Sequence, residues 1–79
     1  MSETQTRPIH QIALEIRADW TKPYFGAVPY LRAMLGLSTI TDTYGADDGR
    51  SIVAYFLSNA AAWRGPTARR CKAELKGML

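Results

Sequence analysis

The sequence predicts a small all-α domain, a compact single-domain bundle of three to four helices. Apolar residues recur at intervals of three and four in several segments, which is the spacing of one helical face. Glycine and proline separate these segments and mark the turns between them. A chain of 79 residues suffices for one domain with a thin core, because short chains bury only about 60–65% of their surface on folding. We expect a single helical domain over residues 8–79, preceded by a flexible N-terminus of residues 1–7.

The first two helices are expected at about residues 8–20 and 27–37. Pro8 suits the first position of a helix, and Pro29 is tolerated because it lies in the first turn of the second helix. Between the two helices, residues 22–26 contain a proline and a glycine that turn the chain. The first helix has one apolar face, which is made of Ile9, Ile12, Ala13, Ile16 and Trp20.

Two further helices are expected in the second half of the chain. The third covers about residues 47–63, after a turn-rich loop at 38–46, and Asp47 or Asp48 is its expected N-cap. The fourth covers residues 66–76 and begins with a proline. The inner face of the third helix comprises Ile52, Phe56, Ala60 and Trp63, and that of the fourth comprises Ala68, Cys71, Leu75 and Leu79.

Positive charge is concentrated near the C-terminus. The net charge is +3, but residues 1–63 carry five Arg and Lys against six Asp and Glu, and residues 64–79 carry five against one. A cationic surface of this kind is a candidate contact for phosphates or for an acidic protein surface. We call four of these side chains the basic flank: Arg64, Arg69, Lys72 and Lys76.

Two other groups are candidate binding residues. Asp42, Asp47 and Asp48 form an acidic cluster that lacks the ligand spacing of a calcium loop. Turn formation and helix capping explain the cluster, and a patch that faces a partner is the alternative. Tyr24 belongs to an aromatic-rich stretch, residues 20–30, from which we expect exposed side chains that anchor an interface.

The sequence contains no recognisable catalytic set. The chain has one histidine, His10, and one cysteine, Cys71, so the usual zinc ligand sets and an internal disulfide are not expected. We therefore expect no enzymatic activity, no metal and no cofactor. The position of Cys71 on an inner helical face favours a buried, inert thiol; an intermolecular disulfide, in a possible homodimer, is the alternative.

The composition predicts a cytoplasmic protein that does not contact membranes. No apolar run approaches the roughly 20 residues needed to span a bilayer, and the first residues lack the apolar stretch of a signal peptide. The expected function is the binding of another macromolecule. A small nucleic-acid-binding or regulatory module that uses the basic C-terminal helix is one form of this hypothesis.

Four strings of the sequence resemble a family of small helical proteins carried by bacteriophages and prophages. The resemblance covers about residues 8–79, and the succession of WRG and ARRCKAEL is its most specific part. Most members of this family have no assigned function, and one similar protein is a type I-C anti-CRISPR protein. The resemblance therefore implies a non-enzymatic inhibitor that binds a host type I CRISPR–Cas surveillance complex in the bacterial cytoplasm and blocks target-DNA capture. The strings are IHQIALEIRADW, KPYFGAVPYLRAM, YGADDGRSIVAYFLSNAAAWRG and ARRCKAELKGML.

Overall fold

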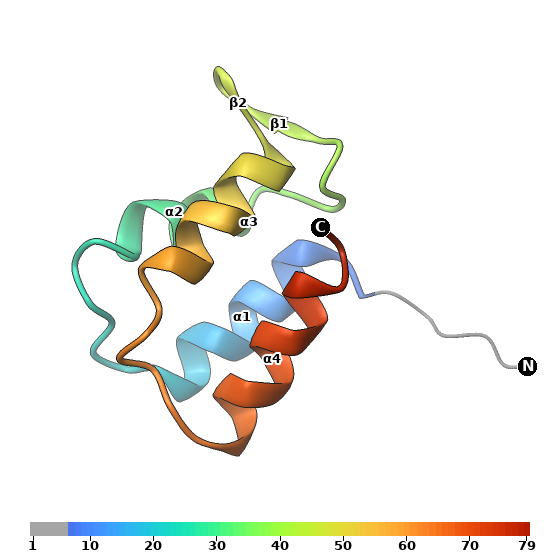
Figure 1. Ribbon diagram of the computed structural model, residues 1–79. Helices are drawn as coiled ribbons and strands as arrows, with labels where there is room; N and C mark the ends of the chain where they lie inside the picture. Colours follow the sequence, from blue (N-terminus) through green and yellow to red (C-terminus); the bar gives the residue numbers. More distant parts are fainter. Residues whose placement is uncertain (1–6) are drawn as a thin grey trace, which may run out of the picture.

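The computed structural model describes residues 7–79, which fold into four helices and a two-stranded sheet (Figure 1). The expected all-α class is confirmed. Residues 1–6 of the expected flexible N-terminus lie outside the described residues. The helices are α1 (Ile9–Asp19), α2 (Val28–Met34), α3 (Gly49–Ser58) and α4 (Pro66–Lys76), and the strands are β1 (Thr43–Tyr44) and β2 (Asp47–Asp48).

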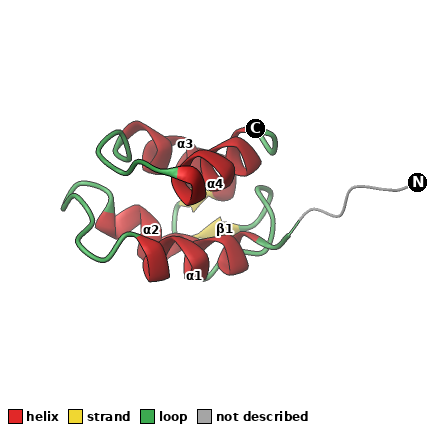
Figure 2. Ribbon diagram, turned by 90° about the horizontal axis from the view of Figure 1, so that it is seen from below, coloured by secondary structure: helices red, strands yellow, loops and turns green. Residues whose placement is uncertain are grey.

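The helices form two layers (Figure 2). One layer contains α1 and α2, and the other contains α3 and α4. Between the layers, α1 packs mainly against α4, and α2 packs mainly against α3. The two strands pair antiparallel in a short hairpin that projects beyond α3 (Figure 1). Within residues 7–79, none of the helices has the length and apolar character needed to cross a membrane.

The core lies between the two layers and contains most of the apolar faces expected from the sequence. The α1 positions Ile9, Ile12, Ala13 and Ile16 are buried, whereas Trp20 is half-buried and packs against the core. Leu79 is 45% exposed, so the expectation that it faces inward is wrong, because α4 ends three residues earlier. The other buried side chains expected from the third and fourth helices are Ile52, Phe56, Ala60, Trp63, Ala68, Cys71 and Leu75.

Helix α3 ends at Ser58, five residues before the end expected from its apolar spacing. The hydroxyl of Ser58 donates to the Ala54 carbonyl, and the side-chain amide of Asn59 donates to the Tyr55 carbonyl. Such side chains favour helix ends because they compete for the backbone groups that continue a helix. Residues 60–63 continue with the same inward spacing although they are no longer helical, which is why the apolar pattern overestimated the length of the helix.

Helix α2 is also shorter than expected and ends at Met34. The amides of Leu35, Gly36 and Leu37 each bond to a carbonyl three residues earlier, which tightens the chain after the helix. Leu37 nevertheless stays fully buried, and its carbonyl accepts a hydrogen bond from the His10 amide at 2.8 Å. This bond ties the end of the second helical segment to the start of α1.

The expected N-cap of α3 is confirmed at Asp48, whose carboxylate accepts a hydrogen bond from the Ser51 amide at 2.8 Å. The next residue, Gly49, is buried against the preceding loop. A Cβ atom at Gly49 would lie 2.8 Å from the Thr39 carbonyl oxygen and 2.9 Å from the backbone of Ile40. The close approach of two backbone segments therefore requires glycine here.

Truncation of the core at Phe56 is expected to destabilise the domain strongly. Phe56 is fully buried, and its replacement in Phe56→Ala should cost about 3–5 kcal/mol in the free energy of unfolding. The matched control is Leu14→Ala, since Leu14 is 54% exposed on α1. Thermal and urea denaturation of both variants measure the difference. Equal stability of the two variants would show that Phe56 does not fill the core as described.

Candidate binding surface

The basic flank divides into two kinds of side chain. Arg64, Arg69 and Lys76 are exposed, and no acidic side chain within residues 7–79 forms an ion pair with them. Lys72 is only partly exposed, and its ammonium donates to the Trp63 carbonyl at 2.6 Å. The same ammonium lies 5.9 Å from the centre of the Trp63 ring. Lys72 therefore stabilises the connection between α3 and α4, and the exposed cations left as candidate binding groups are Arg64, Arg69 and Lys76.

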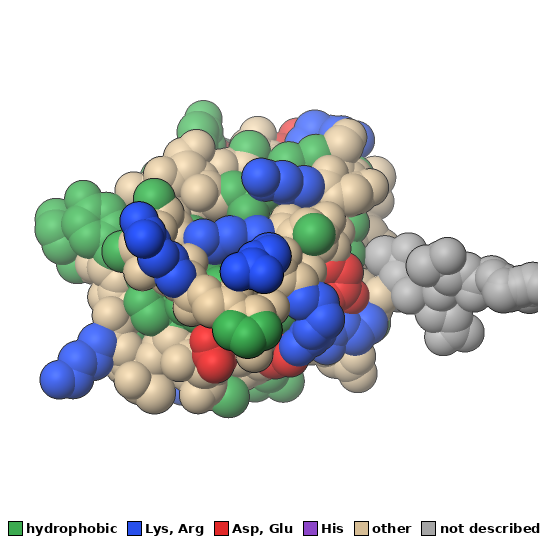
Figure 3. Space-filling view, turned by 60° about the horizontal axis from the view of Figure 1, so that its bottom comes forward, with side chains coloured by type: hydrophobic (Ala, Val, Ile, Leu, Met, Phe, Trp, Pro, Cys, Tyr) green, Lys and Arg blue, Asp and Glu red, His purple; other side chains and the backbone are tan. Residues whose placement is uncertain are grey.

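The pKa of Lys72 reflects its partly buried position and the cations around it. Burial lowers the pKa of its ammonium, and repulsion by Lys76 and Arg64 lowers it further. Figure 3 shows Lys and Arg side chains gathered on this face of the molecule. A compact group of cations is suited to an acidic protein surface or to phosphates.

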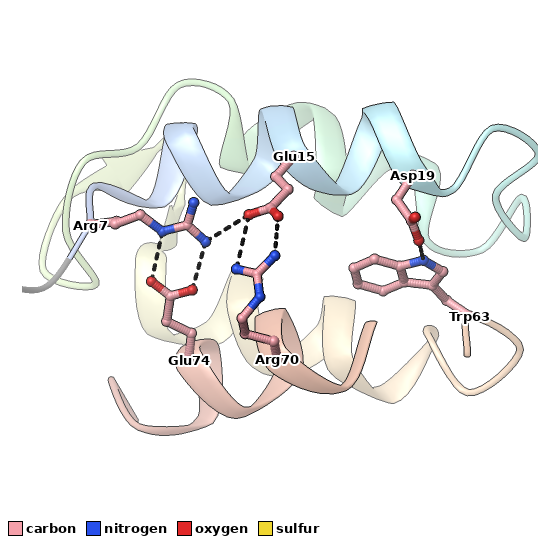
Figure 4. Close-up of polar contacts among 6 residues, drawn as sticks. All are labelled: Arg7, Glu15, Asp19, Trp63, Arg70 and Glu74. Carbon is pink, nitrogen blue, oxygen red and sulfur yellow. Dashed lines mark hydrogen bonds and ion pairs between the residues drawn. The ribbon is translucent and has the colours of Figure 1, made fainter. Parts of the chain in front are cut away.

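Two cations that the basic flank does not include hold α4 to α1. Arg70 of α4 bonds to Glu15 of α1, and Arg7 bridges Glu15 and Glu74 of α4, with a nitrogen–oxygen distance of 2.6 Å to Glu74 (Figure 4). Arg7 was expected in the flexible N-terminus, but it takes part in this four-residue network. The sequence offered no signal for the pairing, because Arg7 and Glu74 are far apart in the chain.

The ion pairs of this network shift the pKa values of its members. Hydrogen bonding to Arg70, then to Arg7, lowers the pKa of Glu15 to about 2. Hydrogen bonding to Arg7 likewise lowers the pKa of Glu74, and the bond to Glu74 raises the pKa of Arg7. Both carboxylates are therefore ionised near neutral pH and stabilise the contact between α1 and α4.

A group of aromatic side chains lies at the end of the molecule where the connection between α1 and α2 meets the end of α3. Phe25 is 79% exposed, and its ring centre lies 4.9 Å from that of Tyr24. Asn59 lies beside Tyr24, since a Cβ atom at Gly26 would touch both. We call Tyr24 and Phe25 the aromatic surface. Another exposed ring, Tyr55 of α3, is tilted against Tyr30 at 5.4 Å.

Hydrophobic side chains and cations lie side by side on one face of the molecule (Figure 3). In Figure 3 hydrophobic side chains protrude at the left edge, where Figure 1 has the connection between α1 and α2, and cations gather beside them. Exposed aromatic side chains were expected from residues 20–30, and Tyr24 was singled out among them. Phe25 is the more exposed ring, and the sequence could not rank the two because residues between helices have no periodicity that predicts orientation.

The acidic cluster mostly has structural roles. Asp42 accepts hydrogen bonds from the amides of Ser38 and Thr39, at 2.8 and 3.1 Å, and these bonds lower the pKa of its carboxyl. Asp48 caps α3, and the bond from the Ser51 amide lowers its pKa in the same way. Asp47 is exposed on β2. Turn formation and capping thus account for two of the three carboxylates, as one of the two sequence interpretations proposed.

The thiol of Cys71 is fully buried in the core. Burial raises the pKa of the thiol, and the charge of Glu15 adds to this effect. The structure therefore favours the interpretation of Cys71 as a buried, inert thiol. An intermolecular disulfide through Cys71 would require the core to open first.

In the part of the chain that the structure describes, no three side chains of His, Cys, Asp and Glu lie close enough together to hold a metal ion. His10 lies half-buried in the first turn of α1. Comparison of the chain with models of protein families, with curated proteins and with solved structures finds no match.

Replacement of Glu15 is expected to reduce the loss of stability in acid. Because folding lowers the pKa of Glu15 from 4.5 to about 2, its contribution to stability is full above 4.5 and is lost as the pH falls toward 2. Glu15→Gln removes this contribution, so its melting temperature should fall less than that of the native chain over this interval. Asp47→Asn, a change at an exposed carboxylate, is the control. If acid lowers the melting temperature of Glu15→Gln as much as that of the native chain, the network does not have the stabilising role described.

Proposed function

We propose that this domain is a non-catalytic inhibitor that binds a host type I CRISPR–Cas surveillance complex in the bacterial cytoplasm and prevents capture of target DNA. The observation that carries a binding role is the aromatic surface, where Phe25 is 79% exposed beside Tyr24. Aromatic side chains are common anchors of protein interfaces because they bury a large area with few rotatable bonds. The resemblance of residues 8–79 to phage-borne proteins supports the choice of partner.

The proposed contact combines the aromatic surface with Arg64, Arg69 and Lys76. The rings would enter an apolar depression of the partner, and the cations would meet acidic side chains around it. A net charge of +3 argues against imitation of DNA by the whole molecule, since such imitation requires an acidic surface. Inhibition by occupation of a protein surface therefore agrees better with the charge of the chain than inhibition by mimicry.

The test of this function is target-DNA capture by a purified type I-C surveillance complex, measured with and without a molar excess of the domain. We expect capture to fall and the domain to co-migrate with the complex on a sizing column. Undiminished capture, with no co-migration, would exclude this partner. Co-migration with undiminished capture would retain binding and exclude the proposed mechanism of inhibition.

Surface variants then locate the contact. Phe25→Ala should weaken binding by about 2 kcal/mol or more, roughly thirtyfold in Kd, because an exposed anchor is removed. Its control is Leu14→Ala, which removes an exposed apolar side chain from α1. Arg69→Gln should also weaken binding. Its control is Gln11→Glu on α1, which changes the net charge by the same amount. Equal binding by each variant and its control, with all four folded, would move the contact elsewhere.

A second candidate function, nucleic-acid binding, is favoured by one observation. Arg64, Arg69 and Lys76 are exposed cations with no ion-pair partner in residues 7–79. Nevertheless, α3 ends at Ser58, so residues 59–65 separate it from α4. This connection is longer than the 3–4-residue turn typical of a helix-turn-helix motif. Binding of this kind would therefore be through phosphates rather than base edges.

Salt dependence distinguishes this second function. Three phosphate contacts would make the logarithm of the association constant fall with the logarithm of the salt concentration with a slope of about −3 for duplex DNA. A gel-shift titration at low salt, repeated over rising salt, measures that slope. Absence of any shifted band at the lowest salt concentration would eliminate nucleic-acid binding by this surface.

A further inference from the structure

A groove runs between the end of α1 and the length of α2, next to the connection that carries Tyr24 and Phe25. Its volume is about 510 Å³, and it is open to solvent. The α2 residues that line it follow one helical face, since Val28, Leu31 and Leu35 are spaced by three and four. Trp20 lines it from the end of α1. The groove therefore has an apolar floor made from two helical segments.

The floor of the groove is incompletely covered. Leu31 is only 4% exposed, but Trp20, Val28 and Leu35 are each half-buried and remain in contact with solvent. One face of the Trp20 ring is already stacked on Trp63, at a centroid distance of 5.7 Å and an angle of 9°. Additional burial of this floor by an apolar side chain would be favourable, at about 25 cal/mol for each Å² removed from water.

Two arginines border the apolar floor. Arg17 and Arg32 are both exposed and both line the groove, whereas no Asp or Glu of residues 7–79 lines it. Each arginine also lies in the last turn of its helix, where a cation is favourable next to the negative end of the helix dipole. The helix dipole explains why an arginine is favourable at the end of each helix. It does not explain why the two arginines border the same apolar groove. Their placement gives the groove a positive rim.

We propose that this groove docks a segment of a partner protein that carries apolar side chains together with Asp or Glu. The apolar side chains would cover Trp20, Val28 and Leu35, and the carboxylates would accept paired hydrogen bonds from Arg17 and Arg32. An acidic, apolar peptide matches both properties of the groove. A nucleic acid matches only the arginines, because its phosphates gain nothing from an apolar floor.

The arginines of this docking site lie away from α4, which carries two cations of the proposed contact, although Pro23 of the groove directly precedes Tyr24 of the aromatic surface. Arg17 is two residues from Glu15 and two from Asp19, which places its side chain about 200° around α1 from each of them. Glu15 bonds to Arg70 of α4, and Asp19 accepts from the indole of Trp63. Arg17 therefore lies on the side of α1 opposite to α4. Arg17→Gln/Arg32→Gln leaves Arg69, Lys76 and Phe25 in place, so different variants test the two proposals.

Selection from a displayed library of random peptides on the immobilised full chain tests the proposal. We expect the enriched peptides to combine apolar residues with Asp or Glu. Their affinity, measured by fluorescence anisotropy, should fall about tenfold or more for Arg17→Gln/Arg32→Gln. Arg50→Gln, which removes a cation near the hairpin, is the control and should leave the affinity unchanged. A thermal melt of each variant establishes that it is folded.

Four results would overturn the proposal. The first is no enrichment over the bare support, and the second is enrichment of peptides without acidic residues. The third is equal affinity of the enriched peptides for the native chain and for the folded Arg17→Gln/Arg32→Gln variant. The fourth is self-association in sedimentation that the same variant abolishes, which would assign the groove to a second copy of this chain.

Discussion

The contacts of Trp63 join α4 to the end of α1. Its ring is buried and stacked on Trp20, whose edge packs against Phe56 at 6.3 Å. Its indole N–H donates to Asp19 at 2.8 Å (Figure 4). Its carbonyl accepts a hydrogen bond from Lys72. One residue outside any helix thus connects the end of α1, the core face of α3 and the middle of α4. Because buried polar groups require partners, the two hydrogen bonds make burial of this non-helical segment favourable.

Some cations of α4 have structural contacts within the domain, and others remain available to a partner protein. Lys72 is held at the carbonyl of Trp63, and Arg70, although exposed, is paired with Glu15. What remains at the surface is a smaller set of cations, together with exposed aromatic rings. A surface of mixed aromatic and cationic character is typical of protein interfaces, in which aromatic residues and arginine are enriched. The proposed inhibition depends on this combination rather than on charge alone.

The sequence predicted the fold better than it predicted the surface. Apolar spacing located all four helices and nearly all of the core, and the residue types at the helix starts identified Asp48 as an N-cap. The spacing failed at residues 59–63, which keep inward-facing residues after the helix has ended. The Arg7–Glu74 pair and the exposure of Phe25 were missed, because both depend on how distant segments meet rather than on local periodicity.

The most direct test of the role of Trp63 is amide hydrogen exchange in Trp63→Phe. Phenylalanine keeps an apolar ring and the carbonyl that accepts from Lys72, but it cannot donate to Asp19. The account predicts faster exchange concentrated in residues 19–27 and 59–65, with the contact between α2 and α3 still protected. Unchanged protection in residues 19–27 and 59–65, or an equal loss of protection throughout the domain, would contradict the account.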